Sequence, residues 1–349
     1  MPGARSSSTW WSASSEALRP PAWHGLRVDG DESSELAGVR LSHLDQPLFD
    51  GAGATKGDLV AYLDGVRERL LPELRDRALS VVRARLGQAP FMQKNLPAHA
   101  PDWIRTTTVW AQASKREVHY PVCDDRRTLV WLANQRAVEL HPALLLVGEE
   151  RQTHLVLDLD PPGEVDPDDG FRMAVAAALL VREALGSAGL SGAVKTSGAK
   201  GVHVFVPLTP DASVPDVAAA TRAVAARAAA LDPATATTEF VKEERGGKVF
   251  VDSTRAGGAT VVAAYSPRAR PGVPVSFPVG WDELEQVRPG DLTVLTALDR
   301  LAEDHWSSVM AAPQALPADL VAEGHEIPIA RVVAMHEGKR RKRERASGD

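Results

Sequence analysis

Two aspartates in the segment HLVLDLDPP (residues 154–162) are the first side chains whose type and spacing suggest chemistry. Asp158 and Asp160 interrupt an apolar run that is otherwise typical of a buried strand. Residues two apart in a strand point to the same face, so these carboxylates lie side by side and need a compensating charge. Asp252 ends a second apolar segment, KVFVD, in the same way. Three carboxylates at strand ends can therefore converge on one site.

Such a cluster suits divalent cations, because carboxylate oxygens are the ligands that magnesium and manganese prefer. Two bound ions can clamp the attacking and leaving oxygens of a phosphoryl transfer. Other interpretations stay open, since a D-x-D pair can cap a turn and two carboxylates can hydrolyse a glycoside. The acidic loop that follows (Asp166, Asp168 and Asp169) lacks the spacing of an EF-hand. The carboxylates alone favour metal-dependent phosphoryl chemistry by a narrow margin.

A second group of polar residues lies in KTSGAKGVHVFVPL (195–208), which reads as strand, turn and strand. Glycines in the turn allow backbone N–H groups to approach an anion, while Ser197 adds a hydroxyl and Lys200 adds charge. His203 follows on the second strand, where a structural role and a phosphate contact are equally supported. The spacing is not that of a Walker A loop.

Arginines form the third group. Arg255 follows Asp252 by three residues, and YSPRARPG (265–272) supplies Arg268. A guanidinium matches phosphate oxygens with two parallel hydrogen bonds. Together with the aspartates and the Ser/Lys/His turn, these arginines describe a site for a nucleoside triphosphate.

The elements that must position these residues alternate between helix and strand. Helices are predicted at 55–77, capped by Thr55, and at 170–189 and 214–231. Strands are predicted at 78–86, 154–160, 195–208 (two strands) and 248–252, with 259–266 as a hairpin partner of the last across Gly257–Gly258. Residues 128–141 read as a short strand or turn followed by helical spacing. Several direct hairpins among alternating helices predict an α/β (α+β) fold with mixed sheets.

Composition sets the class of protein. The 349 residues are 44% hydrophobic and 25% charged, as in an ordinary globular protein, and no apolar run reaches the roughly 18 residues of a membrane span. The N-terminus lacks the apolar core of a signal peptide, so we expect a cytoplasmic protein with no membrane partner. A single cysteine, Cys123, excludes a disulfide framework. The formal charge of −6 is unevenly distributed, with a basic region at 51–120 and an acidic one at 154–170.

The predicted organisation has three parts. Residues 1–24 are Ser-rich and aperiodic, and we expect a disordered arm there. Residues 25–323 form the catalytic domain, and residues 324–349 form a basic tail that ends in GKRRKRERASGD.

Several stretches within residues 40–310 occur in an order that is typical of one protein family. They are TKGDLVAY, FMQKNLPAHAPDW, WLANQRAVELH, VLDLDPP, KTSGAKGVHVFVPL, KVFVD and YSPRARPGVPVSFPVGWDEL. In this order they resemble the polymerase domain of bacterial ligase D proteins, within the archaeo-eukaryotic primase-polymerase superfamily. The resemblance implies two packed α/β subdomains of mixed sheets with the active site in the cleft between them.

The resemblance also implies roles for residues. Asp158, Asp160 and Asp252 would bind Mn²⁺ or Mg²⁺ in a two-metal site. The nucleoside triphosphate would be bound by Ser197, Lys200, His203, Arg255 and Arg268. Members of the family extend primers and fill short gaps in DNA repair, and they commonly prefer ribonucleotides. We therefore expect the protein to bind gapped or primer-template DNA. The expected location is the bacterial nucleoid.

DNA contacts follow from the same resemblance. Lys56 corresponds to a lysine that binds the 5′-phosphate across a gap, whereas the second such lysine is Gln46 here. In the family, a pair of aromatic residues stacks on the template. The corresponding residues here are Phe91 and Met92, and Lys94 follows them. A methionine supplies less than the roughly 1–3 kcal/mol that a ring gains by stacking on a base, so weaker DNA-end recognition is expected.

No K-x-D-G ligase motif occurs in the sequence. We therefore expect a stand-alone polymerase that works with a separate ATP-dependent DNA ligase. Two other readings remain open, namely a primase that starts chains de novo and a catalytically silent DNA-binding subunit that recruits a ligase through the basic tail. A two-metal nuclease is disfavoured, because it would not need the Ser/Lys/His turn.

Overall fold

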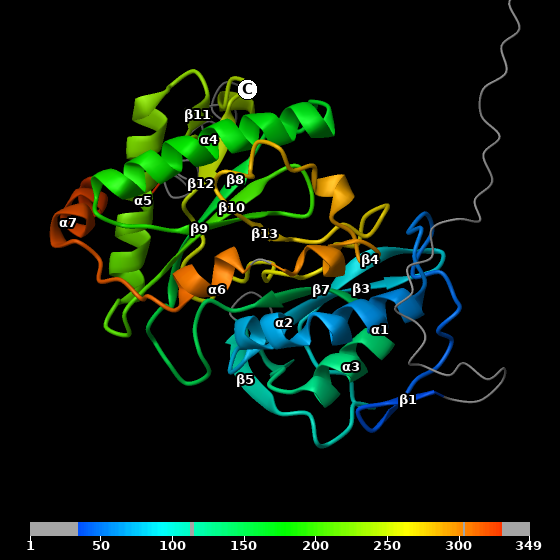
Figure 1. Cartoon of the computed structure of the whole chain (residues 1–349). Helices are drawn as coiled ribbons and strands as arrows, with labels where there is room; N and C mark the ends of the chain where they lie inside the picture. The colour runs from blue at the N-terminus through cyan, green and yellow to red at the C-terminus, as the bar shows by residue number, and fades with distance from the viewer. Residues whose placement is uncertain (1–33, 112–114, 303, 330–349) are drawn as a thin grey trace, which may run out of the picture.

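The computed structural model describes residues 34–111, 115–302 and 304–329. The predicted Ser-rich arm and residues 330–349 of the basic tail lie outside these ranges. Two sheets of different size, each covered by helices, share one continuous hydrophobic core (Figure 1). The predicted mixed α/β class is confirmed. No helix in the described part of the chain is long and apolar enough to cross a membrane.

The larger sheet has six strands in the order β11-β12-β8-β10-β9-β13. Its strands are β8 (His154–Asp160), β9 (Ala193–Thr196), β10 (Val202–Pro207), β11 (Ala236–Thr237), β12 (Val249–Asp252) and β13 (Pro278–Val279). Only the pairing of β11 with β12 is parallel, so the sheet is mixed. Every residue of β9, β10 and β12 is buried, and β8 is buried at all positions except its two ends, because helices or other segments cover these strands.

The helices α4 (Pro167–Ser187) and α5 (Val214–Leu231) pack on this sheet and on each other (Figure 1). Asp166 caps α4 and Ser213 caps α5, each accepting a hydrogen bond from a backbone N–H of the first turn. The helix α7 (Ala318–Glu326) packs against α5, and α6 (His305–Met310) packs against β9, β10 and β13. α7 thus continues across the predicted domain boundary at residue 324.

The smaller sheet has three antiparallel strands in the order β4-β3-β7. They are β3 (Leu79–Arg85), β4 (Gln88–Gln93) and β7 (Ala137–Pro142). The helices α1 (Lys56–Gly65), α2 (Arg67–Leu74) and α3 (Arg126–Asn134) lie beside it (Figure 1). Two short ribbons, β1–β2 (Glu35–Leu36 and Val39–Arg40) and β5–β6 (Thr106–Ala111 and Arg116–Pro121), complete this part.

The capping box predicted at Thr55 is confirmed. Its hydroxyl accepts a hydrogen bond from the backbone N–H of Asp58, whose carboxylate accepts one from the Thr55 backbone. The single helix predicted over 55–77 is two helices, because the chain bends at Val66, between α1 and α2.

The order predicted for residues 128–141 is wrong, since the helix α3 comes first and the strand β7 follows. Asp125 caps α3, and all six residues from Thr128 to Ala133 are buried, so this helix is covered around its circumference. The run TLVW has a high strand propensity, but the cap and burial against α1 override it.

The hairpin predicted at Gly257–Gly258 is also wrong. β12 already has a strand on each side, β8 and β11, so its ladder offers no free edge to residues 259–266. These residues instead cross to the smaller sheet, where Ala263 N–H donates to the Leu140 carbonyl at 2.9 Å. They therefore join the two sheets.

Candidate active site

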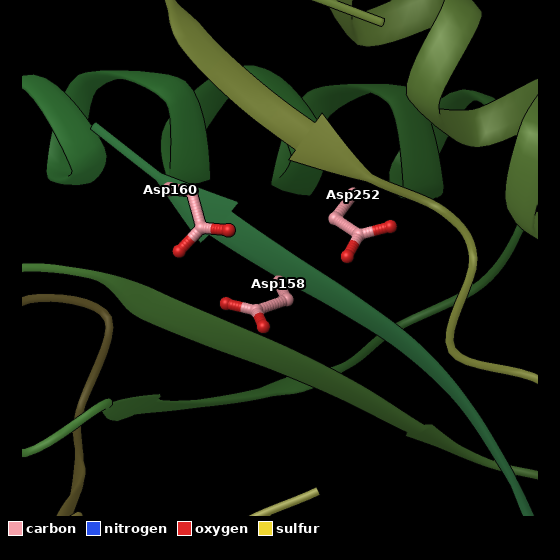
Figure 2. Close-up of side chains that lie close together, drawn as sticks. All are labelled: Asp158, Asp160 and Asp252. Atoms are coloured by element: carbon pink, nitrogen blue, oxygen red, sulfur yellow. The ribbon is translucent and has the colours of Figure 1, made fainter. Parts of the chain in front are cut away.

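The three aspartates of the predicted metal site converge (Figure 2). Asp158 and Asp160 point to the same face of β8, and Asp252 is the direct cross-strand partner of Asp158 on β12. One carboxylate oxygen from each residue lies within 4.8 Å of the others. Asp158 is 8% and Asp252 6% exposed. The strand-end geometry expected from the sequence is therefore present.

Arg255 and His203 compensate the negative charge of the three aspartates. A guanidinium nitrogen of Arg255 lies 2.9 Å from an oxygen of Asp158 and 3.2 Å from an oxygen of Asp252. His203 Nε2 lies 3.1 Å from the other oxygen of Asp158. Although burial opposes it, these two neighbours hold the pKa of Asp158 well below its usual range.

Asp160 has the opposite shift. Desolvation, followed by repulsion from Asp158 and Asp252, raises the pKa of Asp160 to about 6 even though the tip of the side chain reaches solvent. The cluster thus holds more negative charge than Arg255 neutralises. Oxygen ligands with a surplus of negative charge fit a hard divalent cation, so the residues suit Mg²⁺ or Mn²⁺.

His203 is itself held from behind by Lys195. Lys195 is fully buried, and its Nζ lies 2.8 Å from His203 Nδ1 and 2.5 Å from Ser276 Oγ. Because Lys195 donates to Nδ1, the proton of the neutral imidazole is assigned to Nε2, which faces Asp158. Desolvation and the nearby Lys195 lower the pKa of His203 to about 4. The ring is therefore a neutral donor pointed at the acidic cluster.

The glycine turn between β9 and β10 places Ser197 next to Arg268. Ser197 Oγ accepts hydrogen bonds from the backbone N–H groups of Ala199 and Gly201, and its carbonyl accepts one from Arg268 at 2.5 Å. Gly198 has φ +67°, and a Cβ there would lie 2.6 Å from Arg268 Cγ. Only glycine allows this close approach.

Two arginine nitrogens in the site have donor capacity to spare. Within the described ranges, the buried Nε atoms of Arg255 and Arg268 have no hydrogen-bond partner. Arg268 Nε does lie 3.2 Å from Glu139 Oε2, which is an ionic contact without the geometry of a hydrogen bond. A buried N–H without an acceptor is costly, and an anion in the site would relieve that cost.

Lys200 was expected to add a charge to the turn for binding an anion, but its ammonium group is already hydrogen-bonded within the protein. Its Nζ donates to the carbonyls of Pro162 and Gly163, both at 2.8 Å, and so ties the turn to the segment that follows Asp160. The lysine lies beside the acidic cluster and fixes the loop next to it.

The comparisons with known proteins agree with this geometry. The family model described as "LigD, primase-polymerase domain" matches residues 55–306. The chain belongs to the LigD primase-polymerase family. This family comprises metal-dependent nucleotidyltransferases, and the chain is one of them.

Relatives in the LigD primase-polymerase family include two curated proteins. The bifunctional non-homologous end joining protein LigD of Bacillus subtilis is 33% identical over 268 residues, which are 75% of this chain and 42% of that protein. The multifunctional non-homologous end joining protein LigD of Pseudomonas aeruginosa is 32% identical over 312 residues, which are 86% of this chain and 36% of that protein. The chain thus spans less than half the length of either relative.

A solved structure shares the fold. It is the polymerase domain from Mycobacterium tuberculosis ligase D in complex with DNA, at a TM-score of 0.71 and 31% identity. The similarity covers 79% of this chain and 99% of that domain. The two proteins therefore share their fold over most of this chain.

The predicted DNA-contacting residues of this LigD-family chain lie apart from the acidic cluster in the sequence and on the smaller sheet or its helices. Phe91 and Met92 are 39% and 46% exposed on β4, and Lys94 follows β4 at the surface. The Arg85 guanidinium lies 5.8 Å from the centre of the Phe91 ring. Lys56 is only 3% exposed, and its Nζ donates to the Ser42 carbonyl at 2.6 Å.

Sequence reasoning missed the residues that support the site. Glu139 on β7 forms an ion pair with Arg268, and it accepts hydrogen bonds from His141 Nε2 at 2.8 Å and Ala269 N–H at 2.9 Å. Lys195 supports His203 as described. The sequence does contain a signal for both residues, because each is a charged residue inside an apolar strand, AVKT or AVELHP. Burying a charge is costly unless the charge is paired.

Proposed function

We propose that this protein is a template-dependent nucleotidyltransferase that extends primers and fills short gaps in DNA during non-homologous end joining. The observation that carries this proposal is the convergence of Asp158, Asp160 and Asp252 opposite two arginines with unused buried donors. The names of the relatives support the repair pathway, and the DNA complex of the related domain supports a DNA substrate.

The proposed chemistry follows from the residues. Divalent cations held by the three carboxylates, Mn²⁺ or Mg²⁺, would lower the pKa of the primer 3′-hydroxyl and stabilise charge on the transferred phosphate. Arg255 and Arg268 would direct their free N–H groups to the β- and γ-phosphates. Ser197 and the backbone of its turn would contact the same phosphates.

His203 and Lys200 would take supporting roles. His203 would donate a hydrogen bond from Nε2 either to Asp158 or to a phosphate oxygen, and Lys195 keeps that proton in place. Lys200 would add positive charge near the phosphates while it fixes the adjacent loop. Groups positioned in this way before the substrate binds would stabilise the transition state without reorganisation, which is the main source of catalysis in phosphoryl transfer.

On the smaller sheet, Phe91 would stack on a template base, and Lys94 would contact the backbone of the template. We also propose a preference for ribonucleotides and action in the bacterial nucleoid, where the DNA lies. Because the sequence has no K-x-D-G motif, the nick left after filling would require an ATP-dependent ligase active site outside these residues.

The test is extension of a labelled primer across a gap of one to three nucleotides, with either metal and either ribo- or deoxyribonucleotides. Addition should follow the template, stop when EDTA removes the metal, and disappear in Asp158→Ala. The exposed Asp168 on α4 provides a matched control, and Asp168→Asn should extend the primer like the wild type. Binding of gapped DNA without any addition by the wild type would instead favour the silent ligase-recruiting subunit.

A further inference from the structure

The loop that carries Arg255 is bonded to the side chain of a buried glutamine. Gln152 lies two residues before β8 and is only 1% exposed. Its Nε2 donates to the Arg255 carbonyl at 3.3 Å, and its Oε1 accepts a hydrogen bond from the Gly257 N–H at 2.8 Å. The amide therefore satisfies one carbonyl and one N–H of a segment that has left the sheet.

These bonds take the place of a ladder that ends at the acidic cluster. The pairing of β12 with β8 ends at Asp252, opposite Asp158. The chain then continues toward the first residues of β8, because the two strands are antiparallel. Gly257 has φ +64°, which favours glycine, and a Cβ there would lie 3.3 Å from Val214 Cγ1. The loop therefore ends in a tight turn against Gln152.

Both ends of the loop are held by groups outside it. Gln152 Nε2 also donates to the His154 carbonyl at 2.7 Å, so the glutamine is anchored on β8. At the other end, the Asp252 carboxylate accepts a hydrogen bond from the Thr254 N–H at 2.8 Å. The backbone of Arg255 is thus fixed between a metal-ligand candidate and a buried amide.

The position of this backbone decides where the guanidinium lies. One guanidinium nitrogen of Arg255 is 2.9 Å from Asp158 and 3.2 Å from Asp252, while the carbonyl of the same residue is bonded to Gln152. Within the described residues its buried Nε has no hydrogen-bond partner, so it can donate to an anion. A misplacement of about 1 Å in a substrate-positioning group can cost about 100-fold in rate.

We propose that Gln152 is a positioning residue for nucleotide binding, which fixes the loop so that Arg255 meets the β- and γ-phosphates. The proposal rests on the triphosphate contact that the proposed function assigns to Arg255. The Gln152 amide bonds to backbone groups of the loop and of β8, so its effect on the nucleotide passes through Arg255. Removing Gln152 should therefore matter only while the Arg255 guanidinium is present.

The test is a double-mutant cycle on ATP affinity, measured by isothermal titration calorimetry with Mn²⁺ and without DNA. Gln152→Met keeps the length of the side chain, removes its hydrogen bonds and should lose about 10-fold in affinity. Arg255→Met should lose about 10–100-fold, and the double variant should lose no more than Arg255→Met alone. Additive losses, or wild-type affinity in Gln152→Met, would overturn the proposal.

Gln314 provides the matched control for folding. Its amide also bonds to backbone, donating to the Ser191 carbonyl at 2.7 Å and accepting from the Ser191 N–H at 2.8 Å, in the turn between α4 and β9. Gln314→Met should lower Tm but bind ATP like the wild type. If Gln152→Met does not fold, Gln152→Asn, whose amide is one methylene shorter, should lose ATP affinity. Wild-type affinity in a folded Gln152→Asn would overturn the proposal.

Primer extension separates this proposal from the proposed function. Binding of ATP without DNA needs no polymerase activity, so the cycle decides the role of Gln152 even if the wild type extends no primer. In that case only the gap-filling function fails. If the wild type extends primers but the losses in the cycle are additive, only the role of Gln152 fails. A wild type that binds no ATP would overturn both.

Discussion

Lys195 and His203 are buried neighbours on adjacent strands, with Lys195 Nζ 2.8 Å from His203 Nδ1. This contact passes through the imidazole to Asp158, because His203 Nε2 lies 3.1 Å from that carboxylate. Lys195 bonds to His203 and Ser276 rather than to the aspartates, yet its contact with Nδ1 assigns the ring proton to Nε2. Lys195 is a positioning residue, and its effect can be measured separately from its effect on folding.

Lys195→Met should reduce primer extension by about 10–100-fold, as expected for a residue that orients a ligand-contacting group. Thermal stability should change little, because burial already disfavours the charged form of Lys195 and lowers its pKa well below the usual value. Lys195→Arg keeps a donor and should retain part of the activity. If the Tm of Lys195→Met fell so far that unfolding explained the whole loss of activity, the lysine would be purely structural.

Glu139→Gln should weaken nucleotide binding through Arg268. A hydrogen bond from His141 and the charge of Arg268 lower the pKa of Glu139 to about 2 in spite of its burial, so the carboxylate is ionised at neutral pH. The amide removes the negative charge that positions Arg268, and KM for the nucleotide should rise by about 10-fold with a small change in kcat. The exposed Glu149 gives a control, since Glu149→Gln should leave KM unchanged. A fall in kcat at constant KM would contradict this role.

Gly198→Ala should destabilise the protein more than the same change at Gly189. Both glycines have left-handed backbones, with φ of +67° and +72°, but only at Gly198 would a Cβ clash, at 2.6 Å from Arg268 Cγ. Gly189→Ala therefore measures the backbone cost alone, about 1–2 kcal/mol. Urea denaturation should show the larger loss for Gly198→Ala, and nucleotide affinity should fall only in that variant. Similar losses for both would mean that Arg268 moves aside without consequence.

The preference for a 5′-phosphate should decline as the pH rises from 7 to 9. Lys56, which the family resemblance assigns to the 5′-phosphate, has a pKa lowered to about 8 and therefore loses its charge over this interval. The second ionisation of the phosphate, with a pKa of about 6, is nearly complete at pH 7. Lys56→Arg should show no such decline.

Loss of folding would not explain that decline. The pKa of Lys56 is lower in the folded protein than its ordinary value of 10.5, so the unfolded chain binds more protons between the two values. This group therefore makes the free energy of unfolding rise with pH over that range. A pH-independent preference in the wild type would show that Lys56 does not bind the phosphate.

The sequence by itself determined that Asp158 and Asp160 lie side by side at the end of one strand. Asp158 and Asp160 share a face because strand side chains alternate, and their place at a strand end follows from Pro161 and Pro162. The turn around Gly198 is equally local, since its glycines precede a new apolar strand within a few residues. Such features depend on neighbours along the chain, and they were found without the fold.

Only the tertiary structure decided which distant residues meet. Residues 259–266 leave β12 because both of its sides are already paired, and that depends on β8 and β11. The contacts of Glu139 with Arg268 and of Arg136 with Gln46 join residues more than 75 positions apart. Such contacts depend on how two sheets pack and where a turn points, and no local pattern of residues encodes them.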